Sequence, residues 1–350
     1  MSFDSNDYFR NMILVTGGTG LVGSHLLYHL LLENDSIRAI HQKHSDLNAV
    51  KTVFNYYNAG AALLFEKIDW IEASLDNVPS LELAFEGVHQ VYHCAAIVSF
   101  KSSDYQKMRR INIDGTTNIV NLCISTNVDK LCFVSSVAAI EKNVDDKPMD
   151  ESDNWNTGTD KSGYAITKYG AEMEVWRASQ EGVDVVIVNP GVILGSGFWH
   201  KGTGRMFANI NKGLRFYTKG VTGFIGVKDV VKVMVSLMNS EINNERFVLI
   251  SENLSFQQVL NFIADALKKE RPTIRINRFM SECIWRIEYL RSKIMGSNPL
   301  LTKRSARSAL SNHIYTAEKI QNQLGYEFES IEASVKNIAN DFRYEKPIQS

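Results

Sequence analysis

The stretch MILVTGGTGLVGSHL, residues 12–26, decides the fold of this chain. Residues 12–15 are apolar and partly β-branched, which predicts a buried strand. Gly17, Gly20 and Gly23 follow at the spacing Gly-x-x-Gly-x-x-Gly, and apolar residues then recur with helical period. Glycines let backbone approach a pyrophosphate, and a helix N-terminus attracts that anion. Strand, turn and helix together therefore predict a dinucleotide-binding βα unit, although a glycine-rich turn alone can be only a turn.

The second predicted strand, residues 36–41, leads to the expected adenosine ribose. An acidic residue there suits the ribose hydroxyl of NAD, and a basic residue suits the 2′-phosphate of NADP. Arg38 and Lys43 are basic, and the first acidic residue is Asp46. We therefore expect NADP as the cofactor, with NAD as the alternative; the two charges could also be solvated residues at a strand end.

A Tyr-x-x-x-Lys pattern lies further along the chain, after a predicted strand that ends at Ser135 and Ser136. Tyr164 and Lys168 are four residues apart in a predicted helix and share one face. A Lys ammonium lowers the pKa of a nearby tyrosine from its usual value near ~10. Such a tyrosine can donate or accept a proton near neutral pH. The alternative is a pair that merely decorates a helix.

These motifs resemble the extended branch of the short-chain dehydrogenase/reductase superfamily. This branch includes nucleotide-sugar epimerases and dehydratases, dihydroflavonol-reductase-like enzymes and 3β-hydroxysteroid-dehydrogenase-like enzymes. Thr-Gly-Gly-Thr-Gly-x-x-Gly at residues 16–23 and His-x-Ala-Ala at residues 93–96 carry the resemblance together with the Tyr-Lys pair. It is dense over residues 13–231 and thin beyond them.

The resemblance implies a role for each catalytic candidate. Tyr164 is expected to be the acid/base, Lys168 its electrostatic partner and a ribose contact, and Ser136 the ligand of the substrate oxygen, with Ser135 as its nearest rival. The substrate candidates are Ser99, Phe100 and Phe198. The cofactor candidates, from the residues and the resemblance together, are Thr16, Gly17, Gly20, Leu21, Val22, Gly23, Arg38, Lys43, Ser74, Leu75, Ala95, Ala96, Tyr164, Lys168, Pro190 and Val192.

The sequence departs from the family pattern at several places. Ser74 stands where the family has the Asp that contacts adenine, and Asn189 replaces a family Arg near the nicotinamide. Asn112 matches an Asn that supports the active-site strands. We also expect a mobile loop over the substrate at residues 195–204, and a helix-capping role for Asp229.

Composition limits the other classes of function. The 350 residues have a formal net charge of −1, which gives no support to a nucleic-acid partner, and 44% are hydrophobic. The four cysteines lack paired metal spacing, so we expect no metal site. No apolar run approaches the ~18–20 residues that span a bilayer, and the polar start of the chain does not resemble a signal peptide. We expect a cytoplasmic protein with a small-molecule substrate; a homodimer stays open.

The predicted fold is α/β, a doubly wound Rossmann sheet with a smaller C-terminal substrate-binding part. We assign residues 11–190 to the NAD(P)-binding domain, with additions from about 220–250, and residues 191–345 mainly to substrate binding. The predicted reaction interconverts a hydroxyl and a carbonyl on an apolar or aromatic substrate. Basic and apolar residues interleave over residues 271–307, which predicts an amphipathic helix over an apolar pocket or, alternatively, a contact with an anionic membrane. The other candidate functions are a nucleotide-sugar epimerase or dehydratase and a non-catalytic NAD(P)-binding regulator.

Overall fold

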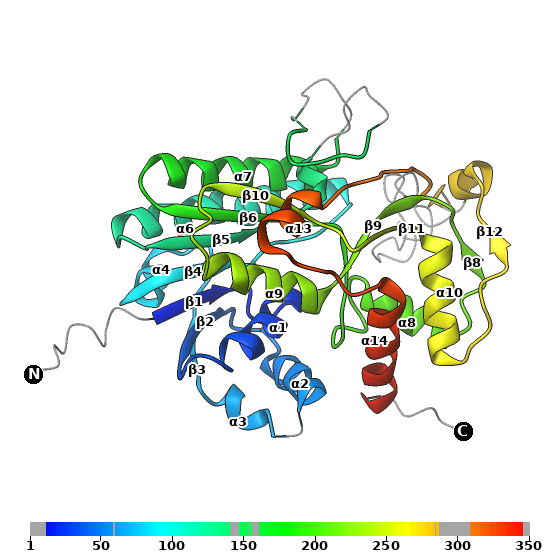
Figure 1. The fold of residues 1–350 in the computed structure, drawn as a ribbon, viewed down its shortest axis with the longest axis horizontal. Coiled ribbons are helices and arrows are strands. Elements are labelled where there is room, and N and C mark those ends of the chain that lie inside the picture. The colour runs from blue at the N-terminus through cyan, green and yellow to red at the C-terminus, as the bar shows by residue number, and fades with distance from the viewer. Residues whose placement is uncertain are drawn as a thin grey trace, which may run out of the picture.

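A parallel sheet forms the centre of the molecule (Figure 1). The computed structural model describes residues 12–58, 60–140, 147–153, 155, 161–283, 285–286 and 309–345. Across these ranges, seven strands form one sheet in the order β10-β6-β5-β4-β1-β2-β3, and each neighbouring pair is parallel. The strands are β1 (Met12–Thr16), β2 (Ile37–His41), β3 (Ile68–Glu72), β4 (Val88–His93), β5 (Lys130–Val134), β6 (Asp184–Pro190) and β10 (Glu245–Leu249).

Helices cover both faces of this sheet, as the doubly wound prediction requires. One face packs against α1 (Leu21–Leu30), α2 (Leu47–Tyr57), α9 (Val227–Met238) and α13 (Glu318–Leu324). The other face packs against α4 (Val78–Ala84), α6 (Gly115–Ser125) and α7 (Gly163–Gln180). The short helix α3 (Ala62–Phe65) follows α2.

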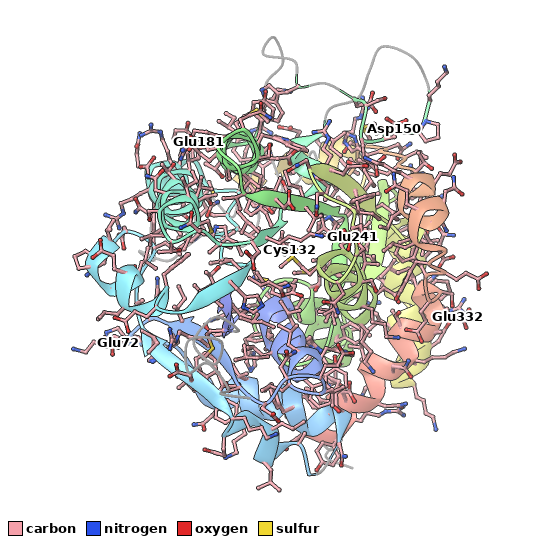
Figure 2. All side chains as sticks on the ribbon, turned by 60° about the vertical axis from the view of Figure 1, so that its left-hand side comes forward. Glu72, Cys132, Asp150, Glu181, Glu241 and Glu332 are labelled. Atoms are coloured by element: carbon pink, nitrogen blue, oxygen red, sulfur yellow. The ribbon has the colours of Figure 1, made fainter. Side chains whose placement is uncertain are left out.

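Burial on both faces explains the apolar strands. All five residues of β5 are buried, and its neighbour β6 is buried at six of seven positions. Strands covered on both sides are expected to be continuously apolar rather than alternating. Figure 2 shows Cys132 of β5 inside the molecule, whereas Glu72, Glu181 and Glu332 lie at its outside.

The strand order reverses at β1, which has β2 on one side and β4 on the other. Ligands of open α/β sheets bind at the carboxyl ends of the strands at such a point. The carboxyl ends of β1 and β4 are joined there by a hydrogen bond of 3.2 Å from the Cys94 amide to the Thr16 carbonyl. The fold therefore directs attention to this edge of the sheet.

A smaller group of elements packs around its own apolar cluster beside the sheet (Figure 1). A three-stranded sheet in it has the order β11-β9-β7, and β8 pairs with β12. Its elements are β7 (Val192–Leu194), α8 (Gly204–Asn211), β8 (Phe216–Tyr217), β9 (Val221–Gly226), β11 (Glu252–Ser255), α10 (Phe256–Leu267), β12 (Ile274–Arg275) and α14 (Ile331–Glu345). No helix among the described residues is both long enough and apolar enough to cross a membrane.

The segment before α6 is irregular. A 3₁₀ turn (Ser102–Asp104) leads into α5 (Tyr105–Met108) and then into a π-helical turn, Arg109–Asp114. Wide turns of this kind are frequent at functional sites. This one contains Asn112.

Candidate active site

The glycine turn is shaped for close backbone approach. Gly17 has a φ of +69°, and a Cβ there would lie 2.6 Å from the Ala95 nitrogen. A Cβ on Gly23 would lie 2.2 Å from the Gly17 carbonyl oxygen. Gly20 is the N-cap of α1, and no side chain among the described residues caps it. A tight turn followed by an uncapped helix N-terminus suits a pyrophosphate, so these residues fit a dinucleotide. Leu21 and Val22 begin that helix.

A buried histidine joins the first and fourth strands. His93 Nδ1 lies 2.6 Å from the Thr16 hydroxyl, and His93 Nε2 lies 2.9 Å from the Thr116 hydroxyl. Thr116 donates to the Asn112 carbonyl, so its oxygen can accept the Nε2 proton. Burial lowers the pKa of His93 to about 3, and the ring is therefore neutral. His93 holds the strand ends at which Thr16 and Ala95 lie.

Asn112 binds the chain just after Ala95 and Ala96. Its side-chain oxygen accepts from the Ile97 amide at 2.7 Å, and its amide donates to the Ile97 carbonyl at 2.9 Å. It also donates to the Thr167 hydroxyl at 3.1 Å. The predicted supporting role of Asn112 is thus confirmed, and it extends to the helix that carries Tyr164.

Ser136, Tyr164 and Lys168 converge at the carboxyl ends of β4 and β5. A hydrogen bond joins Tyr164 to Ser136. The buried Lys168 ammonium donates to the Val134 carbonyl at 2.6 Å and lies 4.5 Å from the centre of the Phe133 ring. Tyr164 and Lys168 lie on one face of α7, and Ser136 follows the end of β5.

Burial opposes charge at both ionisable members of this group. It raises the pKa of Tyr164, while the hydrogen bond from Ser136 acts in the opposite direction. It lowers the pKa of Lys168 to about 8, against the attraction of Glu172. The pKa of Tyr164 is thus raised by burial and not lowered as its spacing from Lys168 predicts. Tyr164 is therefore a protonated phenol at neutral pH, as a proton donor must be.

The loop after Ala96 brings an aromatic side chain to the tyrosine. The ring centres of Phe100 and Tyr164 are 6.2 Å apart, and Phe100 is 44% exposed. Ser99, the other candidate in this loop, donates to Asp104 at 2.6 Å and accepts from the Lys101 amide. Ser99 thus shapes the loop, whereas Phe100 presents a surface beside the phenol.

Ser74 and Leu75 follow β3. Ser74 donates to Asp76, whose pKa this hydrogen bond lowers, and its oxygen can still accept a bond. The Leu75 carbonyl accepts from Asn118 at 2.8 Å. A Cβ on Gly115 would lie 2.7 Å from the Leu75 Cβ, so the start of α6 packs closely against Leu75.

Arg38 does not lie where the sequence analysis places it. Its Nε donates to Asp69 at 2.7 Å, and its Nη1 donates to the carbonyls of Ala84 and Glu86. Ala84 is the last residue of α4, and Glu86 lies between α4 and the amino end of β4. The guanidinium therefore stabilises a helix C-terminus at the amino ends of the strands, whereas the glycine turn follows the carboxyl end of β1. We therefore correct the assignment of Arg38 as a cofactor residue. Lys43 is exposed in the turn that follows β2.

The segment at residues 195–204 is also different from the expectation. Trp199 is buried, and its indole donates to Glu345 at 2.6 Å. Ser196 donates to Asp341 at 2.5 Å. The segment is therefore anchored to α14 instead of forming a mobile loop, and Phe198 within it is half-buried. Pro190 and Val192, at the end of β6 and the start of β7, lead into it.

Asp229 does not cap α9. The N-cap is Gly226, and the Asp229 carboxylate accepts from the Tyr326 hydroxyl at 2.7 Å and the Glu329 amide at 3.0 Å. The aspartate fastens the chain before α14 to the first turn of α9. The neighbouring residue Lys228 lines the pocket between α1, α9 and α14.

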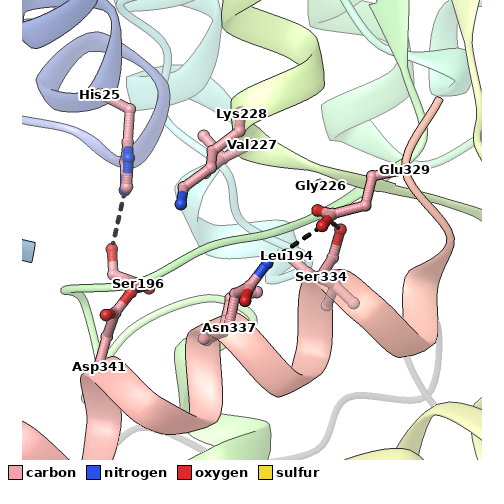
Figure 3. A pocket seen from close by; sticks show the side chains of 11 residues that line it. His25, Leu194, Ser196, Gly226, Val227, Lys228, Glu329, Ser334, Asn337 and Asp341 are labelled. Atoms are coloured by element: carbon pink, nitrogen blue, oxygen red, sulfur yellow. Dashed lines mark hydrogen bonds between the residues drawn. The ribbon is translucent and has the colours of Figure 1, made fainter. Parts of the chain in front are cut away.

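A small pocket of about 20 Å³ lies between α1, α9 and α14 (Figure 3). His25, Lys228 and Asp341 line it, and burial lowers the pKa of His25 to about 4. The His25 ring contacts the Ser196 carbonyl at 3.1 Å. Ser136, Tyr164 and Lys168 are not among its lining residues, so this pocket is separate from the candidate active site.

A buried polar cluster behind the serines escaped the sequence analysis. Glu172 accepts from Ser135 at 2.7 Å and from Asn189 at 3.0 Å, and it pairs with Arg246 at 3.0 Å. The available signal was a Glu one helical turn after Lys168, on the face that must be buried. Arg246 is 78 residues away from that lysine in the chain, and no local pattern connects it to the site.

Part of the basic and apolar stretch, residue 284 and residues 287–307, lies outside the described residues. In the part that is described, Arg271 pairs with Asp265 at 2.6 Å, and Phe279 is 77% exposed. Within the described ranges, no group of three His, Cys, Asp or Glu side chains is arranged to hold a metal ion.

Known proteins resemble the chain in sequence and in fold. It is 29% identical over 268 residues to sterol demethylase protein B of Methylococcus capsulatus, covering 75% of this chain and 76% of that protein. It is 25% identical over 341 residues to 3beta-hydroxysteroid-dehydrogenase/decarboxylase isoform 1 of Arabidopsis thaliana, covering 89% and 75%. The solved UDP-glucose 4-epimerase of Thermotoga maritima superposes with a TM-score of 0.74 at 18% identity, covering 95% of this chain and 99% of the other.

The family model described as the NAD dependent epimerase/dehydratase family matches residues 13–249, which include the glycine turn, Ser136, Tyr164 and Lys168. Related proteins are named as reductases and dehydrogenases. The chain therefore belongs to the NAD dependent epimerase/dehydratase family and is an NAD(P)-dependent oxidoreductase of the extended short-chain type.

Proposed function

We propose that this protein reduces the carbonyl group of an apolar or aromatic compound to a hydroxyl. The observation that carries the proposal is the convergence of Ser136, Tyr164 and Lys168 beside the glycine turn. Carbonyl reduction adds a hydride to carbon and a proton to oxygen. A dinucleotide held at the turn would supply the hydride, so the chain itself must supply the proton and hold the oxygen.

Tyr164 is the proton donor in this proposal. Its raised pKa keeps the phenol protonated before reaction. The Ser136 hydroxyl, already hydrogen-bonded to Tyr164, binds the carbonyl oxygen and directs it toward the phenol. The buried Lys168 ammonium stabilises the phenolate that forms when the proton leaves.

The surroundings of the phenol support an apolar substrate. Phe100 presents a partly exposed ring beside Tyr164, and Val98 in the same loop is 62% exposed. Apolar side chains gain free energy when a ligand removes them from water. Several relatives are named for aromatic or sterol compounds, among them an anthocyanidin reductase of Arabidopsis thaliana.

NADP is the proposed cofactor, with NAD as its competitor. Lys43 carries this preference alone now that Arg38 is engaged elsewhere. The turn after β2 has no acidic residue before Asp46, and Asp46 caps α2 by accepting from the Ala49 amide at 3.1 Å. A carboxylate used as a cap is less suited to a ribose hydroxyl. The family is NAD dependent by description, so direct binding measurements must decide.

Replacing Tyr164 by Phe tests the proposed reaction. Loss of a positioned acid lowers turnover by about 10²–10⁴-fold, and we expect a loss in this range with cofactor affinity nearly unchanged. Tyr169→Phe on the same helix, where the ring stacks on Trp155, is the matched control. The assay follows reduced nicotinamide absorbance with aromatic ketones, steroid ketones and nucleotide sugars.

Retention of more than about a tenth of the activity in Tyr164→Phe would show that the assigned acid is wrong. Inversion of a nucleotide sugar with no net change in nicotinamide absorbance, and no activity on the ketones, would replace the reductase by an epimerase. Cofactor binding with no turnover of any substrate would favour the non-catalytic regulator.

A further inference from the structure

Glu172 is a fully buried carboxylate whose hydrogen-bond partners adjoin the catalytic group. It lies one helical turn after Lys168 on α7, and its side chain is 0% exposed. Isolated buried carboxylates are strongly unfavourable unless they are paired and hydrogen-bonded. Glu172 meets this condition with three contacts of 3.0 Å or less, to Ser135, Asn189 and Arg246. Because burying a carboxylate is unfavourable, we look for the role of Glu172 in the residues that it contacts.

Two of these contacts converge on the backbone of the catalytic serine. Ser135 precedes Ser136 and donates its hydroxyl proton to Glu172. Asn189 donates both to Glu172 and, at 3.1 Å, to the Ser136 carbonyl. Glu172 thus fixes Ser136 from the preceding residue and from the neighbouring strand β6.

The third contact connects the site to the edge of the sheet. Arg246 lies on β10, and its guanidinium also donates to the carbonyls of Glu151 and Asp153. The Glu151 carboxylate accepts from the Val248 amide at 2.6 Å. Arg246 therefore balances the charge of Glu172 and fastens the segment at residues 147–153, which lies before Tyr164 in the chain.

The negative charge of Glu172 is the main influence that stabilises the protonated form of Lys168. The attraction of Glu172 raises the pKa of Lys168 against the effect of burial. The other titratable groups near this ammonium are Cys94 and His93, at the end of β4, and Tyr164 on its own helix; burial raises the pKa of Cys94 to about 12 and keeps His93 neutral. Arg246 is the cation on the far side of Glu172. Removal of the Glu172 charge would thus leave Lys168 without a nearby carboxylate among the residues that the structure describes.

We propose that Glu172, balanced by Arg246, is a positioning residue that holds Ser136 in place and keeps Lys168 charged. This inference rests on the proposed carbonyl reduction. Glu172 is not expected to touch the substrate or the cofactor. It acts through Ser135, Asn189 and Lys168, and its loss should therefore change turnover and its pH dependence.

The test compares Glu172→Gln with Glu174→Gln. Glu174 is on the same helix and pairs with Arg177 at the surface, so its replacement preserves helix length and the type of substitution. In Glu172→Gln we expect kcat for reduction to fall by about 10–100-fold, while KM and cofactor affinity change by less than about threefold. Glu174→Gln should behave like the unmodified protein.

The pH profile separates positioning from a general loss of structure. Reduction requires the Lys168 ammonium, so activity falls as pH rises through the pKa of Lys168. Glu172→Gln lowers this pKa further, and the alkaline limb should move to lower pH by about one unit. Ser135→Ala removes one contact and keeps the charge, so it should lower kcat without moving the limb.

Three results would overturn the inference: unchanged kcat in Glu172→Gln, a lower kcat with an unmoved alkaline limb, or an equal loss in Glu174→Gln. If Glu172→Gln does not fold, an unmoved kcat in Ser135→Ala would overturn the serine contact. Cofactor titrations over the same pH range provide a readout without turnover, because Lys168 is a proposed ribose contact. If the unmodified protein binds cofactor but reduces no carbonyl compound, the proposed function fails, while a shift of the binding inflection in Glu172→Gln still supports the effect on Lys168.

Discussion

Arg38 and Lys43 are both basic residues of the second βα unit, and the structure predicts opposite consequences for their loss. Arg38→Ala removes a pair with Asp69 at 2.7 Å and two hydrogen bonds to carbonyls at 3.2 and 2.7 Å. Asp69 is 41% exposed, so the ion pair contributes little after solvent screening, about 0–1 kcal/mol. Each charged hydrogen bond is worth about 1.5–3 kcal/mol in general, but water can replace the partners here.

We therefore expect Arg38→Ala to reduce the free energy of unfolding by about 1–2 kcal/mol, which shifts Tm by a few degrees in a chain of this size. The ratio of NADP to NAD affinity should change by less than about twofold, because the Arg38 Nε and Nη1 already donate to Asp69, Ala84 and Glu86. Lys43→Ala should leave stability unchanged and weaken NADP binding by about tenfold, the usual effect of one lost charged contact, while NAD binding is spared.

Calorimetric titration with each cofactor, together with thermal unfolding, distinguishes the two variants. The reasoning is refuted if Arg38→Ala selectively weakens NADP by about tenfold or more, because the guanidinium would then have to leave Asp69 and α4 to reach the phosphate. A preference of the unmodified protein for NAD would instead refute the proposed role of Lys43.

Three further outcomes follow from contacts described above. Gly23→Ala should abolish cofactor binding with the protein still folded, since the added Cβ meets the Gly17 carbonyl; a dissociation constant within about threefold of the original would contradict this. Burial lowers the pKa of His93 from 6.5 to about 3, so the neutral histidine contributes its full stability above pH 6.5 and loses it as the pH falls toward 3. In urea unfolding, the free energy of unfolding of His93→Gln should therefore depend less on pH between 6.5 and 3 than that of the unmodified protein. An identical pH dependence would exclude His93 as its source. Trp199→Phe should destabilise the protein by about 1.5–3 kcal/mol through the lost hydrogen bond to the Glu345 carboxylate, which still accepts from Tyr56; protease sensitivity near α14 would report this, and equal sensitivity would count against the anchor.

Sequence patterns predict the sheet and the core of the site because both depend on local spacing. The glycine turn needs three glycines within seven residues, and Tyr164 and Lys168 meet because a helix repeats every 3.6 residues. The doubly wound sheet follows from the alternation of apolar strands and helices. The π-helical turn around Asn112 was not predictable, since its residues have an ordinary helical pattern.

The errors share one cause: the partner of the residue lies far away in the chain. The basic side chain of Arg38 suggests a cofactor contact, but Arg38 lies within β2, and Glu86 and Asp69 determine where its side chain goes. The segment around Trp199 is expected to be a mobile loop, whereas Glu345, 146 residues later, anchors it. Charge and flexibility at a single position cannot be interpreted without such partners.

The segment at residues 147–153 is hydrogen-bonded both to β10 and to residues 314–316, which affects the order in which the protein is completed during synthesis. Met149 donates to the Ile314 carbonyl and accepts from the Thr316 amide, while Glu151 binds β10 from the other direction. A fragment that stops at residue 249, where the family match ends, contains every strand of the large sheet. It contains the β10 partner of this segment but lacks residues 314–316. The segment that leads toward Tyr164 can therefore reach its final arrangement only after residue 316 has left the ribosome.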